Sequence, residues 1–235
     1  VGSEMCIRDR HQALLAFLAR QGLDMIAPSN HILTNPDILQ RSIETHGLNL
    51  FNGWLNAFDD WTALAFGRET KPENQMRVGI DVATTEGVVV ARTAIAEIIQ
   101  YKPLTEQVHK IPVVIVPAWI MKYYILDLSP SNSLIRYLIN SGYTVFVVSW
   151  KNPDAGDRRI GFDDYRVHGV NAAIDAALTI TSSNQIHLVG YCLGGTLAAI
   201  EAAARGRDGN QTLKSLSLFA SQTDFHEAGE LRLFI

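Results

Sequence analysis

Short apolar segments rich in β-branched residues alternate with helical segments from residue 111 onward, and this alternation restricts the fold more than any other feature of the sequence. The apolar segments that we predict as strands are 113–116, 144–150, 185–189 and 213–220. The helices that we predict between them are 129–141, Asp163 to about Ile180, and 195–205. Because buried strands separated by helices form βαβ units, the sequence predicts an α/β fold with a doubly wound, mostly parallel sheet.

A helical region is predicted before this sheet. Apolar residues recur at helical spacing in residues 11–20 and again from residue 36 to about residue 65. Asn35 is a suitable N-cap for the second of these segments, with Pro36 at the first helical position. Two further strands are predicted at 88–91 and 97–101. We therefore predict a helical region over 11–70 and an α/β core over 71–235.

The two ends of the sequence differ from the rest. Residues 1–10 (VGSEMCIRDR) have no periodicity and lack the apolar core of a signal peptide. We interpret them as an artefact of sequencing or cloning, and Cys6 with them. The last five residues lie inside an apolar run. We therefore interpret the chain as a fragment of a longer protein, truncated before the last strands of its sheet.

Composition excludes several classes of protein. The longest apolar run, 111–121, is interrupted by two prolines and is far shorter than the roughly 18 residues of a membrane-spanning helix. A net charge of −4 gives no electrostatic basis for nucleic-acid binding. Two cysteines form neither a disulfide framework nor, without neighbouring ligands, a zinc site. We expect no metal and a reducing, cytoplasmic location.

The segment that carries chemistry is Gly190 to Gly195 (GYCLGG), which joins a predicted strand to a predicted helix. It has the pattern glycine–x–nucleophile–x–glycine, with Cys192 at the nucleophile position. Such a turn lifts the nucleophile clear of the sheet, and the amides at the start of the helix favour a thiolate. The amide of Leu193 is then placed to donate to an oxyanion. The alternative is a buried structural thiol, because cysteine is often a small core residue.

A second oxyanion donor is expected from the loop that follows an earlier strand. That strand is 113–116, and the loop is 117–124 (PAWIMKYY). Within it the backbone of Ile120 is our candidate donor. The alternative is an aromatic surface loop without a catalytic role.

Four motifs in order give the sequence a specific resemblance. These are PAWIMKYYILDL at 117–128, SWKNPD at 149–154, DDY at 163–165 and GYCLGG at 190–195. Together they resemble the class I polyhydroxyalkanoate synthases, which make poly(3-hydroxybutyrate). Met121 is a departure, since many members have Asn there. A backbone donor at Ile120 would not need that side chain.

The resemblance implies an α/β-hydrolase-like fold and an acyltransferase that polymerises 3-hydroxyacyl-CoA, with CoA as the leaving group and no cofactor. Cys192 would carry the growing polyester chain as a covalent thioester. The resemblance also implies a homodimer of the full-length protein at the surface of polyhydroxyalkanoate granules. Two alternatives remain. One is a Cys-dependent α/β-hydrolase, an esterase or thioesterase, and the other is a non-catalytic granule-binding module.

The catalytic base and acid of such an enzyme follow the nucleophile in the chain. Only 43 residues follow Cys192, and His226 is the single histidine among them. We interpret His226 as a surface loop residue and Asp224 as structural. The missing partners predict that the fragment is inactive alone.

Overall fold

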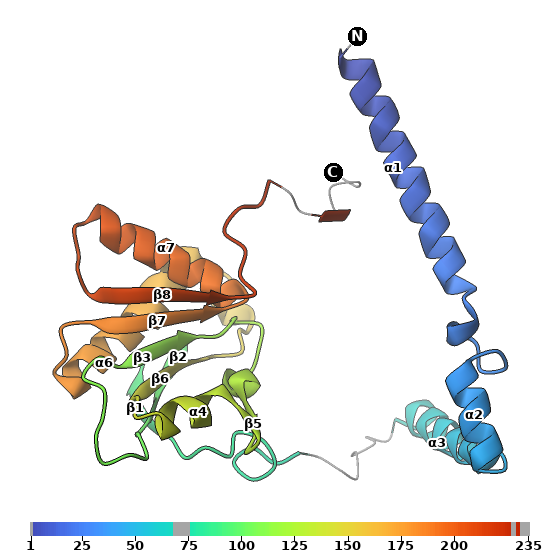
Figure 1. The fold of residues 1–235 in the computed structure, drawn as a ribbon, viewed down its shortest axis with the longest axis horizontal. Coiled ribbons are helices and arrows are strands. Elements are labelled where there is room, and N and C mark those ends of the chain that lie inside the picture. The colour runs from blue at the N-terminus through green and yellow to red at the C-terminus, as the bar shows by residue number, and fades with distance from the viewer. Residues whose placement is uncertain (1, 68–75, 227–228, 231–235) are drawn as a thin grey trace. The chain divides into compact units, whose positions relative to one another are not determined.

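The structure is a computed structural model that describes residues 2–67, 76–226 and 229–230, with side chains from residue 9 onward. The chain divides into two units. The first unit is Val1–Gln75 together with His226–Ile235, and the second is Met76–Phe225. Figure 1 draws the helices of the first unit in blue to cyan and the second unit in green to red. The predicted boundary near residue 70 lies outside the described residues.

The helical unit contains α1 (Gly2–Met25), a 3-10 turn at Pro28–Asn30, α2 (Pro36–Glu44) and α3 (Leu48–Ala65). Asn35 caps α2 as predicted, because its side-chain oxygen accepts hydrogen bonds from the amides of Asp37 (2.9 Å) and Ile38 (3.2 Å). The single helix expected from residue 36 to 65 is interrupted at Gly47, whose φ of 84° ends the α2 path before α3 begins. The artefactual origin of residues 1–10 stays a prediction.

The second unit is built on a six-stranded sheet in the order β1-β2-β6-β3-β7-β8. The strands β3, β6, β7 and β8 run parallel, whereas β1 and β2 form the antiparallel side. This confirms the predicted mostly parallel sheet. Its strands are β1 (Val88–Arg92), β2 (Ala96–Tyr101), β3 (Val113–Val116), β6 (Val145–Trp150), β7 (Ile186–Tyr191) and β8 (Leu213–Phe219).

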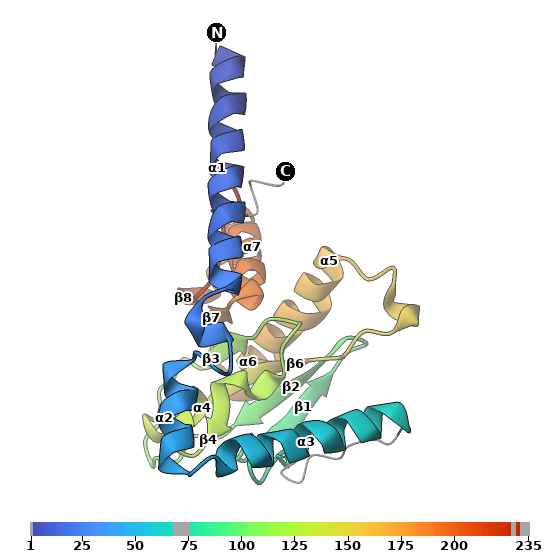
Figure 2. The same ribbon diagram turned by 90° about the vertical axis from the view of Figure 1, so that its right-hand side faces the viewer.

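Helices cover both faces of this sheet (Figure 2). On one face α4 (Leu134–Asn140) buries Ile135 and Ile139 against the sheet. On the other face lie α6 (Ala172–Thr181) and α7 (Leu193–Arg207), whose buried residues include Ile174 and Leu197. Alternate residues of β3 point to the two cores, which explains why this strand reads as an uninterrupted apolar run. No helix in the described ranges is long and apolar enough to cross a membrane.

Two helix starts differ from the prediction. The helix expected from residue 129 begins at Leu134, because 127–133 form a small hairpin of β4 (Asp127–Ser129) and β5 (Asn132–Ser133). The helix expected to start with Asp163 as its cap begins instead after Gly161. The carboxylate of Asp164 accepts a hydrogen bond from the Gly161 amide (2.8 Å) and fixes that start.

This second helix is not continuous. A four-residue α5 (Phe162–Tyr165) passes into a π-helical turn over Arg166–Asn171 before α6 begins. A π-helical turn is wider than an α-helical one and is frequent at functional sites. We call residues 166–171 the wide turn.

Asp127 is fully buried and has a structural environment. Its carboxylate accepts hydrogen bonds from the amide (3.1 Å) and hydroxyl (2.7 Å) of Thr85 and from the hydroxyl of Ser133 (2.6 Å). Its backbone oxygen accepts a fourth from the Ala83 amide (2.9 Å). Asp127 therefore ties the segment before β1 to the β4-β5 hairpin.

We expect Asp127→Ala to lower the free energy of unfolding by about 3 kcal/mol, because it leaves two buried donors of Thr85 and the partly buried hydroxyl of Ser133 without their acceptor. Urea unfolding of the expressed chain followed by tryptophan fluorescence measures this loss. The matched control is Asp163→Ala, since the Asp163 side chain is 81% exposed, and we expect a change within about 0.5 kcal/mol. Equal losses in both variants would contradict the role given to the Asp127 network.

Candidate functional site

Cys192 lies on a sharp reversal between β7 and α7. Its backbone has φ 54° and ψ −127°, a conformation that non-glycine residues rarely adopt. The Cys192 amide donates to the Phe219 carbonyl of β8 (2.9 Å), and its own carbonyl accepts from the amides of Gly195 (2.9 Å) and Thr196 (3.3 Å). The neighbouring strand and the first turn of α7 therefore hold residue 192 in this unusual conformation.

The glycines around Cys192 are required because neighbouring atoms, backbone at Gly190 and Gly194 and the Ser221 side chain at Gly195, come too close for a Cβ. A Cβ added to Gly190 would lie 2.9 Å from the Gly195 nitrogen, and one added to Gly194 would lie 2.6 Å from the Pro117 oxygen. A Cβ on Gly195 would lie 2.6 Å from the Cβ of Ser221. Real Cβ atoms almost never come this close to another heavy atom. Only glycine fits at these three positions, as the strand-to-helix turn requires.

The side chain of Cys192 is half-buried and its thiol is free. The residue stands at the N-cap of the fifteen-residue α7, where the helix dipole presents its positive end. The Leu193 amide is the first of this helix. This geometry suits a nucleophile beside an oxyanion donor, although the assigned roles of Cys192 and Leu193 stay predictions.

The loop after β3 lies against the elbow. The closeness of Gly194 to the backbone oxygens of Val116 and Pro117 brings the start of the loop next to the first turn of α7. The Met121 amide donates to the Ala118 carbonyl (3.0 Å) and closes a turn that contains Ile120, a residue that is 68% exposed. The proximity of the loop agrees with a second donor from this segment. Ile120 as that donor stays a prediction.

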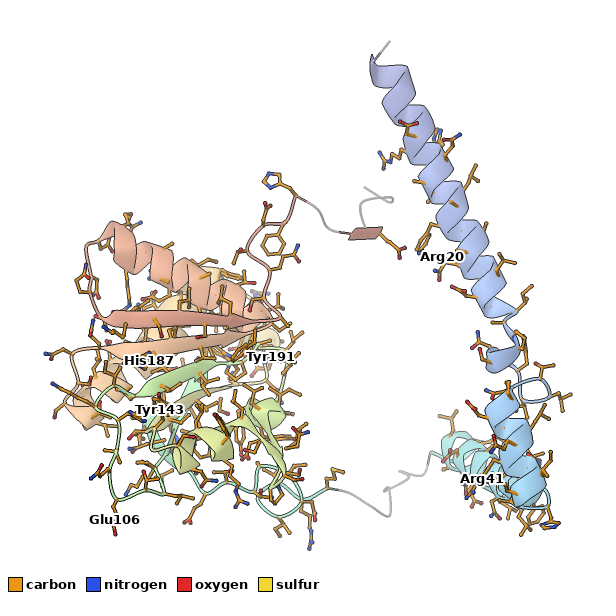
Figure 3. The ribbon with its side chains drawn as sticks, viewed as in Figure 1. Arg20, Arg41, Glu106, Tyr143, His187 and Tyr191 are labelled. Atoms are coloured by element: carbon orange, nitrogen blue, oxygen red, sulfur yellow. The ribbon has the colours of Figure 1, made fainter. Side chains whose placement is uncertain are left out.

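His187 of the α/β core is engaged away from Cys192. His187 is the second residue of β7, and Figure 3 shows it at the opposite end of this strand from Tyr191. Its Nδ1 shares a hydrogen bond with the Ser215 hydroxyl (2.7 Å). Burial lowers the pKa of His187, and the neighbouring Lys214 and His109 lower this pKa further. These contacts fit a structural histidine.

The two candidate partners downstream of the elbow lie near the end of the described chain. The Asp224 carbonyl accepts a hydrogen bond from the Gln222 side chain (2.9 Å), and His226 is grouped with the helical unit. Their interpretation as structural and surface residues stays a prediction.

A cavity of about 630 Å³ opens at the other edge of the sheet, where β3, β7 and β8 begin. Cys192 follows the end of β7, so this cavity is separate from the elbow. Its lining is largely polar: Lys110, Ile111, Ser183, Asn184, Gln185, Asn210, Gln211 and Thr212. Among the described residues, no three His, Cys, Asp or Glu side chains gather closely enough to hold a metal ion.

Two family models match this chain. The one described as the N-terminus of poly-beta-hydroxybutyrate polymerase (PhaC) covers residues 3–138, and the one described as the alpha/beta hydrolase fold covers residues 111–235. The second match confirms the predicted fold class. Among solved structures, one from a structural analysis of two fungal esterases from Rhizomucor miehei is 15% identical to this chain and has a TM-score of 0.45. The match covers 68% of this chain and 49% of the esterase chain.

Curated relatives match almost the whole sequence. The poly(3-hydroxyalkanoate) polymerase of Methylorubrum extorquens is 40% identical over 227 residues, which is 96% of this chain and 37% of the relative. The poly(3-hydroxyalkanoate) polymerase subunit PhaC of Cupriavidus necator is 38% identical over 221 residues, 94% of this chain and 37% of the relative. The chain therefore spans little more than a third of the length of these relatives.

Proposed function

Because the chain belongs to the poly-beta-hydroxybutyrate polymerase (PhaC) family, we propose that it is part of an acyltransferase that polymerises 3-hydroxyacyl-CoA into polyhydroxyalkanoate. The family membership agrees with the resemblance carried by the motifs at 117–128, 149–154 and 190–195. The single observation that carries the proposal is the strained Cys192 at the strand-to-helix reversal, beside the first amides of α7.

The proposed reaction uses Cys192 twice. Its thiolate attacks the carbonyl carbon of the acyl-CoA thioester, the bond from that carbon to the CoA sulfur breaks, and CoA leaves. The acyl group is then held as a Cys192 thioester. The hydroxyl of another hydroxyacyl group attacks this thioester, gives its proton to a general base and regenerates the Cys192 thiolate. The amides of Leu193 and Ile120 would donate to the oxyanion in both steps.

The general base and its acid partner are proposed to lie outside residues 1–235. His187 is hydrogen-bonded to Ser215, His109 is stacked on Tyr143, and the curated relatives are much longer than this chain. The thiol of a cysteine is a poor nucleophile when no general base is present to take its proton. We therefore propose that residues 1–235 alone turn over no substrate.

The test uses the full-length protein encoded by the gene, with 3-hydroxybutyryl-CoA as substrate. We expect CoA release together with insoluble polyester, and no CoA release from purified residues 1–235. Release of CoA with free 3-hydroxybutyrate and no polymer would instead establish a Cys-dependent thioesterase. Turnover by residues 1–235 would show that the base lies within this chain.

A location at the polyester granule surface is a further part of the proposal. The helix α3 exposes large apolar side chains, among them Phe51, Trp54 and Phe58, and the rings of Trp54 and Phe58 stack at 5.6 Å. An exposed aromatic surface of this kind suits contact with an apolar polymer. Homodimerisation of the full-length protein stays a prediction.

A further inference from the structure

Trp150 makes a buried contact with the loop that follows β3. It is the last residue of β6, only 9% exposed, and its indole N–H donates to the carbonyl oxygen of Pro117 at 2.8 Å. The same Pro117 oxygen lies 2.6 Å from the position that a Cβ on Gly194 would occupy. The carbonyl of the first loop residue is therefore held between the indole of Trp150 and the first turn of α7.

Other aromatic residues hold Trp150 in place. The Tyr165 ring lies 5.2 Å from that of Trp150 and 5.6 Å from that of Trp119, which belongs to the loop itself. The rings of Phe162 and Trp119 form a T-shaped contact with their centroids 5.2 Å apart. These contacts join the end of β6, the loop after β3 and the helix α5 into one aromatic cluster.

The wide turn supplies the last wall of this cluster. It brings Gly169 so close to the Trp150 ring that a Cβ there would overlap the ring atoms. Because Gly169 has no side chain, the indole of Trp150 has room to lie where its N–H reaches the Pro117 oxygen. This gives the wide turn a function in the fold, because it presents a glycine where the indole needs space.

The direction of one carbonyl controls the amide that follows it. The peptide between Pro117 and Ala118 is planar and trans, so fixing the Pro117 oxygen also fixes the direction of the Ala118 N–H. Proline adds a locked φ on the other side of that carbonyl. The hydrogen bond from Trp150 therefore fixes the orientation of the Ala118 amide and the direction in which the loop toward Ile120 begins.

We propose that Trp150 is a positioning residue for the oxyanion site beside Cys192. Its N–H holds the Pro117 carbonyl, and through it the start of the loop to which we assign the second oxyanion donor, the Ile120 amide. The proposal rests on the proposed function, because it assigns this loop to the same nucleophile. Oxyanion donors act only when they are held within a few tenths of an ångström of the productive position, and this requirement explains why a buried tryptophan would be placed here.

The test uses reversible addition of butanal to Cys192, which needs neither CoA nor polymer. The Cys192 sulfur bonds to the aldehyde carbon and the thiol proton moves to the aldehyde oxygen, which gives a hemithioacetal. This oxygen occupies the place of the oxyanion. Butanal bound to Cys192 protects the thiol against alkylation by iodoacetamide. The extent of alkylation, measured by intact mass at increasing concentrations of butanal, gives the affinity of Cys192 for the aldehyde.

Two variants remove the donor from position 150 in the full-length protein. Trp150→Phe removes it together with part of the ring, and benzothienylalanine incorporated at position 150 keeps the ring shape and replaces N–H by sulfur. We expect both to bind butanal roughly tenfold more weakly. The rate of Cys192 alkylation without aldehyde should stay within about twofold. Phe146→Leu, a buried substitution four residues earlier in β6, controls for loss of stability.

In turnover of 3-hydroxybutyryl-CoA, we expect both variants to lower kcat roughly tenfold and to leave KM within about twofold. Wild-type affinity for butanal in the benzothienylalanine variant would overturn the proposal. Failure of the wild type to bind butanal, or a loss as large in Phe146→Leu, would overturn it too. If the wild type releases no CoA, the proposed function is contradicted. The affinities of the wild type and the two variants for butanal still decide the role of Trp150 in that case.

Discussion

Cys192→Ala in the full-length protein should release CoA from 3-hydroxybutyryl-CoA at least roughly 10⁴-fold more slowly than the wild type. Alanine has no nucleophile, so neither the acyl-enzyme nor the transfer to a second hydroxyl can form. Continuous detection of free CoA measures the rate. Intact mass after brief mixing with substrate shows whether an acyl group is bound. We expect the wild type to gain the mass of one or more acyl units and Cys192→Ala to gain none.

A substitution in the helix that follows Cys192 provides the control. Gly206 lies near the other end of α7, and a Cβ added there meets nothing within 4 Å, so Gly206→Ala should keep CoA release within about twofold of the wild type. Cys192→Ser keeps the shape of the elbow and should lose most of the activity, because an alcohol is far less ionised than a thiol at neutral pH. CoA release by Cys192→Ala above a tenth of the wild-type rate would exclude this residue as the nucleophile.

The second large effect is expected at Gly194. In Gly194→Ala the new methyl group would lie 2.6 Å from the Pro117 oxygen and 2.5 Å from the Pro117 carbonyl carbon. These are backbone atoms, so the loop and the helix start must move apart. We expect a loss of about 3 kcal/mol in the free energy of unfolding and the loss of butanal binding at Cys192. Urea unfolding and the butanal protection assay measure the two effects.

Gly206→Ala is the control for this substitution. Gly206 lies in the same helix, α7, and a Cβ added there meets nothing within 4 Å. Since alanine is the better helix former, we expect this variant to gain about 0.5–1 kcal/mol and to bind butanal normally. A Gly194→Ala variant as stable as Gly206→Ala would mean that the loop after β3 yields to the methyl group, and that the elbow is less constrained than the contacts around Gly194 indicate.

Elements with a strong local pattern were predictable from the sequence. The run VVIV coincides with β3 at Val113–Val116, because four buried β-branched residues specify a strand with two covered faces. The cap at Asn35 was predictable for a similar reason, since a capping side chain acts on amides two and three residues away. In both cases the interactions that decide the structure lie within a few residues.

Elements decided by distant contacts were not predictable. The residues RVHGVN of the wide turn carry no signal for a π-helix, and the contact that explains it is the one between Gly169 and Trp150 on another element. The start of α4 was wrong by five residues, because the preceding hairpin is fixed by the hydrogen bonds between Asp127 and Thr85, 42 residues apart. The spacing of apolar residues along the sequence carries no information on contacts between residues so far apart.

The site divides in the same way. The placement of Cys192 between a strand and a helix followed from a six-residue motif. The hydrogen bond between Trp150 and Pro117 joins residues 33 apart and has no motif of its own. The nearest signal in the sequence was the segment SWKNPD, which supported the resemblance but did not show which atom its tryptophan reaches.

The wide turn also has a consequence for how the gene can vary. An α-helix advances about 100° per residue, so deleting one codon within 166–171 would let the turn relax into an ordinary helix and would rotate everything before it relative to α6. Tyr165 and Phe162 would then leave the ring of Trp119. Natural variation in this stretch should therefore consist of amino-acid replacements, whereas single-codon gains or losses should be rare between the DDY motif and Asn171.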